Sequence, residues 1–258
     1  MTFIKSEIIN KVFKITLNRP DKYNSFIREM ALQMQKALSD AESDKKVRAI
    51  YISGEGKAFS AGQDLGEATD PKGPGIARIV NEHYNPIIKK IRSIEKPVVC
   101  AVNGVAAGAG ANIALSCDVV IAGTSASFIQ AFSKIGLIPD SGGTFFLPRL
   151  IGFGKASALM MLGDKVTASE ALQMGMIYKV CEDSKLQEEA FAVALTLSEM
   201  PTKGIGLTKR LLNNSLFNSL EKQLEEECKI QTEAADSFDY REGVSAFLEK
   251  RKPVFKGE

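Results

Sequence analysis

The stretch Pro97–Leu115, with the sequence PVVCAVNGVAAGAGANIAL, decides the fold class. Its first part, Pro97–Val102, is a short apolar run that suits a strand buried on both faces. The second part, Val105–Leu115, is small and rich in glycine and then becomes apolar, which predicts a turn that leads into a helix. A strand that passes through such a turn into a helix indicates the α/β class.

The sequence before this stretch shows the same alternation. Ile8–Leu17 is rich in β-forming residues and predicts a strand. Apolar residues at helical spacing predict a helix over Phe26–Leu38, and Val47–Ile52 predicts the next strand. A loop dense in glycine and proline, Asp70–Gly75, precedes a long predicted helix over Ile76–Ile94. Strand, helix and strand in succession again indicate an α/β protein.

The C-terminal part of the chain has a different character. Val119–Ala122 predicts another buried strand, but after Pro201 the strand signals stop and only helical patterns remain. We therefore expect an α/β core over residues 1–200 and a helical region over residues 201–258. The helices predicted in that region are Lys203–Leu212, Leu220–Thr232 and Tyr240–Arg251.

Composition and charge exclude several classes of protein. The net charge of +2 is too balanced for a nucleic-acid partner, which calls for a strongly basic face. No apolar run is long enough to span a bilayer, and the N-terminus leads into strand-like sequence without a secretory signal. Together with four cysteines that lack metal-ligand or CxxC spacing, this predicts a cytoplasmic protein with free thiols and no membrane partner. The single histidine, His83, excludes mechanisms and metal sites that need two histidines, and we expect no metal.

Three segments carry residues suited to chemistry: Phe59–Leu65, Ala101–Asn112 and Gly136–Thr144. In the second, small residues allow a ligand to approach the backbone, and the helix that follows presents N–H groups to an anion. Alternatively, the glycines only allow the helix to pack closely on the sheet. The backbone N–H of Gln63, in the first segment, would be a second donor. Two such donors form an oxyanion hole, which suits a thioester whose carbonyl oxygen takes up enolate charge.

Two aspartates in these segments have open roles. Asp64 is either a catalytic acid or the cap of a turn. Asp140 is either the N-cap of the following helix or a buried carboxylate with a raised pKa. From the residues alone, capping is the commoner role for both.

In their order and spacing, the three segments resemble the enoyl-CoA hydratase/isomerase (crotonase) superfamily, and Arg241–Arg251 resembles its closing helix. The likeness covers essentially the whole chain from Leu17 onward. It implies an α/β spiral of ββα units with a C-terminal helical region that mediates trimerisation. It also implies an enzyme that acts on an acyl-CoA thioester as a homotrimer or a dimer of trimers. Coenzyme A would be part of the substrate, and no other cofactor is implied.

The resemblance also assigns residues. The backbone N–H groups of Gln63 and Ala109 would form the oxyanion hole. Phe247 and Lys250, in the same or a neighbouring subunit, would reach the coenzyme A phosphates. The residues expected to bind coenzyme A are Lys22, Ser25, Ala61, Asp64, Leu65, Phe247 and Lys250.

Two positions separate hydration from isomerisation. Hydratases of this family place two glutamates across the substrate double bond, and at the matching positions of the acyl pocket this chain has Asn112 and Phe132. Adding water needs a base to activate the water and an acid to protonate carbon. The amide of Asn112 does neither, and Phe132 makes the wall apolar. One carboxylate is enough to remove a proton α or γ to the thioester and return it two carbons away, which moves a double bond.

Within the superfamily, the motifs are most similar to those of the isomerases of phenylacetate catabolism that act on ring-1,2-epoxyphenylacetyl-CoA and also shift enoyl-CoA double bonds. In that group the aspartate at the position of Asp140 is catalytic. We therefore predict an isomerase with Asp140 as its catalytic residue. An enoyl-CoA hydratase, a non-catalytic acyl-CoA binder and another acyl-CoA reaction such as dehalogenation remain as alternatives. The stretches that carry this likeness are Asn103–Ala111, Ala131–Lys134, Gly136–Asp140 and Tyr240–Phe247.

Overall fold

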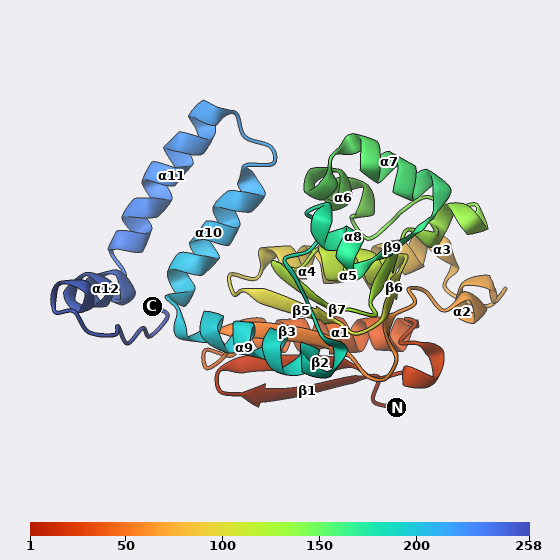
Figure 1. Cartoon of the computed structure of the whole chain (residues 1–258), viewed down its shortest axis with the longest axis horizontal. Coiled ribbons are helices and arrows are strands. Elements are labelled where there is room, and N and C mark those ends of the chain that lie inside the picture. Colours follow the sequence, from red (N-terminus) through yellow and green to blue (C-terminus); the bar gives the residue numbers. More distant parts are fainter.

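Two β-sheets form the centre of the protein, whose computed structural model describes residues 1–258 (Figure 1). The larger sheet has the strand order β1-β2-β3-β5-β7-β10, and the smaller has the order β4-β6-β8-β9. The strands of the larger sheet are β1 (Ile4–Ile9), β2 (Val12–Leu17), β3 (Ala49–Gly54), β5 (Val98–Val102), β7 (Val119–Gly123) and β10 (Lys179–Cys181). Those of the smaller sheet are β4 (Ala58–Ser60), β6 (Val105–Ala107), β8 (Ser127–Ile129) and β9 (Lys165–Thr167).

Successive strands alternate between the two sheets. β3, β5 and β7 lie in the larger sheet, and the strand that follows each of them, β4, β6 or β8, lies in the smaller one. Neighbours within each of these two sets run parallel, because a helical connection returns the chain before the next pair begins. This repeat of two strands and a helical connection confirms the predicted α/β spiral of ββα units.

Helices surround both sheets. α3 continues into α4 through a six-residue π-helical segment, Ile79–Tyr84. The helices of the core are α1 (Arg28–Ser43), α2 (Leu65–Thr69), α3 (Gly75–Arg78), α4 (Asn85–Ser93), α5 (Ala109–Leu115), α6 (Gly143–Ile151), α7 (Phe153–Leu162), α8 (Ala168–Gln173) and α9 (Leu186–Glu199). The last three are α10 (Thr202–Asn214), α11 (Leu220–Ala235) and α12 (Phe238–Leu248).

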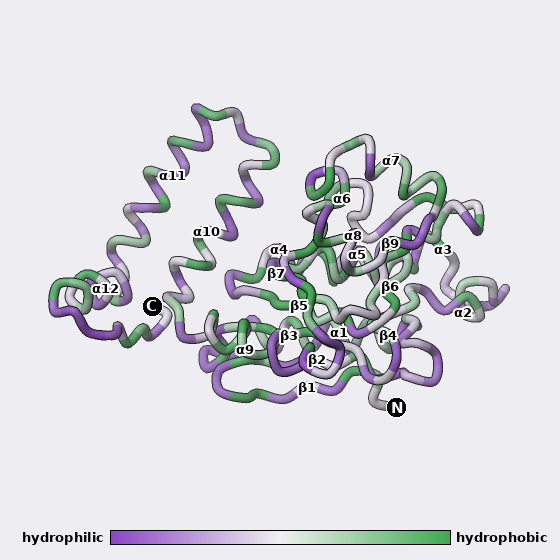
Figure 2. Tube along the Cα trace, in the orientation of Figure 1, coloured by the Kyte–Doolittle hydropathy of each residue, from purple (hydrophilic) through white to green (hydrophobic).

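The larger sheet is covered on both faces. One face packs against α1 and α4 in the main hydrophobic core, where Ile15, Met34 and Ile52 are fully buried. The other face packs against α9 in a smaller core that includes Tyr51 and Ala190. Strands covered on both faces need apolar residues at every position. This is why the sequence of β5 is a continuous apolar run, from which the strand was predicted. Figure 2 shows the hydrophobic residues concentrated in these central strands, whereas the outer helices are mixed.

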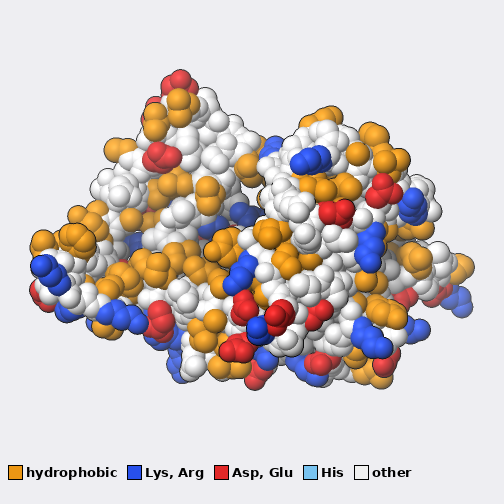
Figure 3. All heavy atoms as spheres, in the orientation of Figure 1, with side chains coloured by type: hydrophobic (Ala, Val, Ile, Leu, Met, Phe, Trp, Pro, Cys, Tyr) orange, Lys and Arg blue, Asp and Glu red, His pale blue; other side chains and the backbone are white.

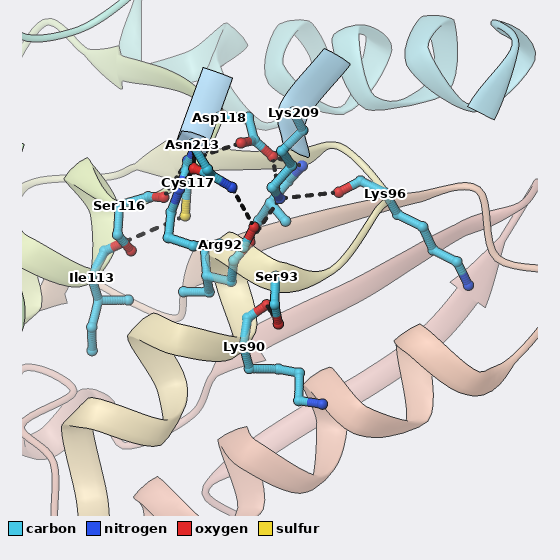
Figure 4. Close-up of polar contacts among 12 residues, drawn as sticks. Lys90, Arg92, Ser93, Lys96, Ile113, Ser116, Cys117, Asp118, Lys209 and Asn213 are labelled. Carbon is cyan, nitrogen blue, oxygen red and sulfur yellow. Dashed lines mark hydrogen bonds and ion pairs between the residues drawn. The ribbon is translucent and has the colours of Figure 1, made fainter. Parts of the chain in front are cut away.

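Helices α10, α11 and α12 form an arm that extends away from the sheets (Figure 1). The arm is joined to the core by Lys209 of α10, whose buried ammonium donates to Oδ2 of Asp118 and to the Ile91 carbonyl, each over 2.7 Å (Figure 4). Arg92 of α4 donates to Oδ1 of the same carboxylate over 2.9 Å and also bonds to Asn213 of α10. Burying an ammonium group is unfavourable unless it is paired, so this network fixes where the arm leaves the core.

The structure corrects the sequence predictions at several elements. The strand predicted over Ile8–Leu17 is two strands, because Asn10 and Lys11 have φ angles of 47° and 68° and form the tight turn of a hairpin. The single helix predicted over Ile76–Ile94 contains the π-helical segment. The strands of the smaller sheet were not predicted, because three residues are too few to show a period.

Three further observations bear on the class of protein. No helix is both long and apolar enough to cross a membrane. No group of three or more His, Cys, Asp or Glu side chains is placed to hold a metal ion. All four cysteines are free thiols, and Cys100, Cys117 and Cys181 are buried whereas Cys228 is exposed.

Candidate active site

A cavity of about 390 Å³ brings the three predicted segments together. Its walls come from the loop between β4 and α2, the N-terminal end of α5, the π-helical segment and the stretch Ala131–Asp140. Nine of the residues predicted for the site line it: Lys22, Ser25, Ala61, Gln63, Asp64, Leu65, Ala109, Phe132 and Asp140.

The backbone N–H groups of Gln63 and Ala109 are both free to serve a ligand. Gly62 and Asp64 bond to the backbone of Phe26, over 2.7 and 2.9 Å, so the N–H of Gln63 between them points the other way. Ala109 is the first residue of α5, where an N–H has no acceptor within the helix. The loops lie against each other, since a side chain built on Gly62 would come within 3.4 Å of the Ala109 nitrogen.

Close packing explains one of the glycines of this segment. A side chain on Gly110 would lie 2.5 Å from the Ser60 carbonyl oxygen, so only glycine lets α5 pack against β4. The alternative given for these glycines therefore holds at Gly110. Close packing at Gly110 is compatible with ligand binding by this segment, because the same contact brings the start of α5 to the cavity.

The side chain of Gln63 is held at both ends. Its Oε1 accepts a hydrogen bond from the hydroxyl of Tyr84 over 2.9 Å, and its Nε2 donates to Glu67 over 2.9 Å. Tyr84 is completely buried at the end of the π-helical segment. A side chain fixed in this way limits how far the peptide plane next to it can rotate.

Asp64 has the structural role. It is the N-cap of α2, where Oδ1 accepts from the N–H of Glu67 over 3.2 Å, and Oδ2 pairs with Arg19 over 2.7 Å. Burial raises the pKa of this carboxyl, but the Arg19 hydrogen bond and the backbone N–H of Glu67 outweigh it and the pKa is lowered. The capping role is confirmed, and Asp64 stays ionised in its ion pair.

Asp140 differs from Asp64 in its place in the helix, in its partners and in the direction of its net pKa shift. It is not the N-cap of α6, since that position is taken by Gly142. No basic side chain pairs with its carboxyl group, and Oδ1 accepts a hydrogen bond from the Ser141 hydroxyl over 2.8 Å. Burial raises the pKa of Asp140 above its ordinary value, and the Ser141 hydroxyl only partly opposes this. A raised pKa makes a carboxyl group at a cavity wall a better proton acceptor, and its protonated form can return the proton.

The wall around Asp140 is apolar. Phe132, Leu137, Ile79 and Val80 line the same cavity as Asp140. They supply the low-dielectric surroundings that disfavour the charged carboxylate, and they offer no group that would hold a water molecule for attack.

Three predicted residues do not line the cavity. Asn112 is buried behind its wall, 1% exposed, and its side chain bonds to the backbone carbonyl of Asp140, so it is not an acyl-pocket residue in this structure. Phe247 and Lys250 lie in or next to α12, at the far end of the arm from α2 and α3 (Figure 1). They cannot reach the cavity of their own chain.

Several residues that support the site were not predicted from the sequence. Tyr84 and Glu67 hold the Gln63 side chain, Arg19 holds Asp64, and Ser141 bonds to Asp140. Only Ser141 has a local signal, because it sits beside Asp140 in a glycine-rich turn. The others act over contacts that no short motif encodes.

Comparison with known proteins agrees with this geometry. The chain is 46% identical to the 1,2-epoxyphenylacetyl-CoA isomerase of Escherichia coli (strain K12), with all of both chains covered. It is 42% identical to a probable enoyl-CoA hydratase of Rhodobacter capsulatus, with 98% of each covered. It is also 37% identical to a trans-2-decenoyl-[acyl-carrier-protein] isomerase of Streptococcus mutans, with 96% of each covered.

Solved structures and a family description give the same result. The crystal structure of a putative enoyl-CoA hydratase/isomerase from Mycobacterium abscessus matches with a TM-score of 0.93 and 38% identity, over 99% of this chain and 100% of that one. The model of the family described as "Enoyl-CoA hydratase/isomerase" matches residues 7–258. With its spiral fold, its paired loops at one cavity and these relatives, the chain belongs to the enoyl-CoA hydratase/isomerase family.

Proposed function

We propose that the protein is an acyl-CoA isomerase that moves a double bond, or rearranges a ring epoxide, with Asp140 as its single proton-transferring carboxylate. The observation that carries the proposal is the contrast between the two carboxyl groups that line the cavity. Asp64 is paired with Arg19, whereas Asp140 has no cationic partner and a raised pKa. Only Asp140 is therefore suited to exchange a proton with a substrate.

The proposed reaction uses the parts of the site in sequence. The thioester carbonyl oxygen accepts hydrogen bonds from the N–H groups of Gln63 and Ala109. Asp140 removes a proton α or γ to the carbonyl, and the two N–H groups stabilise the dienolate charge on oxygen. The same carboxyl group, now protonated, returns the proton two carbons away. General acid–base assistance of this kind contributes about 10²–10⁴-fold, and one oxyanion donor about 10²–10³-fold.

The relatives support isomerisation without deciding it. Two are named as isomerases and one as a probable hydratase. Enoyl-CoA hydratase is therefore the second candidate. Against it stands the apolar wall formed by Phe132 and its neighbours, and the position of Asn112, whose amide is already engaged with the backbone of Asp140. A hydratase needs a second titratable group, and the other carboxyl group at the cavity, Asp64, is held in an ion pair with Arg19.

Coenzyme A would enter along one side of the cavity. Lys22, Ala61 and Leu65 are exposed at the cavity, and Ser25 is buried in its wall. The acyl group would then lie against Phe132 and Leu137. Both proposed reactions are isomerisations with no net oxidation or reduction, so they need no redox cofactor, and the double-bond shift needs only the proton transfer by Asp140. The four free thiols support a cytoplasmic location.

We further propose that Phe247 and Lys250 serve the cavity of a neighbouring subunit in a homotrimer or a dimer of trimers. Support comes from their distance from the cavity of their own chain and from the exposed apolar surface of the protein. Apolar side chains gather over the arm and α7 in Figure 3. The largest exposed ones on these elements are Phe153, Met161, Leu162, Leu212, Leu220, Leu224, Phe247 and Leu248. Exposed apolar side chains on both elements are consistent with contacts between subunits at these places.

The test is incubation with a 3-enoyl-CoA in D₂O, followed by NMR of the product. We expect conversion to the 2-enoyl isomer in which part of the product keeps the original proton, because one carboxyl group carries it from carbon to carbon. Asp140→Asn should slow conversion by about 10²–10⁴-fold, and Asp70→Asn in the exposed loop should leave it unchanged. Accumulation of 3-hydroxyacyl-CoA would make the protein a hydratase. If neither an enoyl-CoA nor a ring-1,2-epoxyphenylacetyl-CoA is converted, the proposal is wrong.

A further inference from the structure

The side chain of Asn112 joins α5 to the backbone of Asp140. Its Nδ2 donates to the Asp140 carbonyl oxygen over 2.8 Å, and its Oδ1 accepts from Nε2 of Gln130 over 2.8 Å. Asn112 and Gln130 are 1% and 4% exposed. If the Asn112 amide were turned by about 180°, its Oδ1 would face the Asp140 carbonyl oxygen, and two acceptors would meet. The hydrogen bond from Gln130 therefore selects the orientation that serves Asp140.

The turn that carries Asp140 needs such support. Ser141 and Gly142 follow it with φ angles of 52° and 75°, and a left-handed conformation is unfavourable for serine. The Asp140 carbonyl oxygen also accepts from the N–H of Gly143 over 2.9 Å, so both of its lone pairs are used. A side chain on Gly143 would lie 2.5 Å from Nδ2 of Asn112, which shows how closely the amide fits into the turn.

The short helix α5 therefore positions both the proposed oxyanion donor and the turn that carries Asp140. Ala109 and Asn112 are three residues apart in α5 and lie on neighbouring positions of the same face. The first presents a free N–H to the cavity, and the second holds the turn of Asp140. The distance between the oxyanion donor and the carboxyl group is thus set within one rigid element.

Resting on the function proposed above, we infer that Asn112 and Gln130 are positioning residues. They hold the carboxyl group of Asp140 next to the substrate carbons from which it removes the proton and to which it returns it. This also gives position 112 a reason to lack a carboxylate. An aspartate or glutamate there has no N–H to donate, and its oxygen would face the Asp140 carbonyl oxygen.

The main test is Asn112→Asp, which keeps the size of the side chain and removes the donor. We expect kcat to fall about 10–100-fold, because a displacement of about 1 Å in a reacting group has an effect of this order. We expect KM and the Kd of a saturated acyl-CoA to change less than about twofold, because neither residue lines the cavity. Gln130→Met, which frees the Asn112 amide and keeps it in place, should give a smaller loss of kcat in the same direction.

A matched control is Ser127→Ala. Ser127 is fully buried in β8, and its hydroxyl has no hydrogen-bond partner. Removing it changes a buried polar group near Gln130 without touching the Asn112 hydrogen bonds, so kcat should stay at the wild-type value. Circular dichroism and the Tm of each variant show whether it is folded.

A double-mutant cycle separates positioning from general damage. If Asn112 acts through Asp140, Asn112→Asp should add almost nothing to the loss in an Asp140→Asn protein. The inference is overturned if Asn112→Asp keeps the wild-type kcat, or if its effect is undiminished in the Asp140→Asn background. Its failure is distinct from that of the proposed function, which fails if Asp140→Asn itself remains active.

Discussion

The hydroxyl of Tyr84 donates a hydrogen bond to Oε1 of Gln63 over 2.9 Å, from a side chain that is completely buried. The ring of Tyr84 also packs on Phe26, with ring centroids 5.8 Å apart, and the backbone of Phe26 holds the peptides on either side of Gln63. Gln63 is thus fixed from its side chain and from its backbone. Its free N–H should point in one direction before any substrate binds.

Replacing Tyr84 by phenylalanine tests whether this matters. The ring and its packing remain, but Gln63 loses the hydrogen bond and its peptide plane gains freedom to rotate. We expect a fall in kcat of roughly 3–30-fold, less than the effect of losing an oxyanion donor altogether. Steady-state kinetics with a 3-enoyl-CoA measures it.

The control for this change is Tyr51→Phe. Tyr51 is also completely buried, and its hydroxyl donates to a glutamine, Oε1 of Gln187, over 2.7 Å. It lies in the smaller core beneath α9, away from the cavity. Both variants should lose similar stability, about 1 kcal/mol for one hydrogen bond. An equal loss of activity in the two would mean that Tyr84 has no special role.

Asp140 should lower the stability of the protein at neutral pH. Because burial raises its pKa, the folded state binds more protons than the unfolded state between the ordinary and the raised pKa. Stability therefore falls as the pH rises through that window, and above it the ionised carboxylate is unfavourable. We expect Asp140→Asn to lose about 10²–10⁴-fold in kcat and to have a higher Tm than the wild type at pH 7.

Thermal unfolding of the two proteins across a pH series checks this. The difference in Tm should be largest at neutral pH and should shrink as acid protonates Asp140 in the wild type. A lower Tm for Asp140→Asn at pH 7 would show that the charged carboxylate stabilises the fold, contrary to the physical argument.

Ser141 should set the acid limb of the pH–rate profile. Its hydroxyl donates to Asp140 and lowers the pKa of that carboxyl, opposing the effect of burial. Without the hydroxyl the pKa rises further, so the base form appears only at higher pH. We expect Ser141→Ala to move the acid limb of kcat/KM to higher pH, and an unchanged limb would mean that another group controls it.

The Lys209 ion pair should contribute to the stability of the whole chain. Lys209→Met leaves Arg92 as the only cationic partner of the Asp118 carboxylate and removes three hydrogen bonds that join α10 to the core. Breaking a buried pair in this way costs about 3–5 kcal/mol. Urea unfolding measures the change, and Lys222→Met in α11 is the control. The exposed Lys222–Glu225 pair should contribute less than about 1 kcal/mol.

The sequence was most informative where a short motif encodes the backbone. The segments that hold Gln63, Ala109 and Asp140 were found from glycines and their neighbours, whereas the roles of Ala109 as a donor and of Asp140 as the catalytic residue were expected from the family resemblance. It was least informative where function depends on contacts between distant residues. Asn112 and Asp140 are 28 residues apart, and no local pattern shows that an asparagine in an apolar helix points at that carbonyl.

The same distinction holds for the fold. The long parallel strands were predicted because burial on both faces makes them apolar throughout. The hairpin turn at Asn10 and Lys11 was missed because lysine is uncommon in a left-handed conformation, so the residues read as one strand. The π-helical segment was missed because its apolar residues still recur at intervals compatible with an ordinary helix.

That segment has an evolutionary consequence. A π-helical turn contains one residue more than the α-helical turn it replaces. Removing a single codon between Ile79 and Tyr84 would restore a regular helix and rotate one end against the other by about 100°. Either Ile79 would no longer line the cavity, or the hydroxyl of Tyr84 would lose its hydrogen bond to Gln63. Relatives that lack this one residue are therefore expected to hold the loop of Gln63 by different contacts, so the length of this helix would divide the family into two groups.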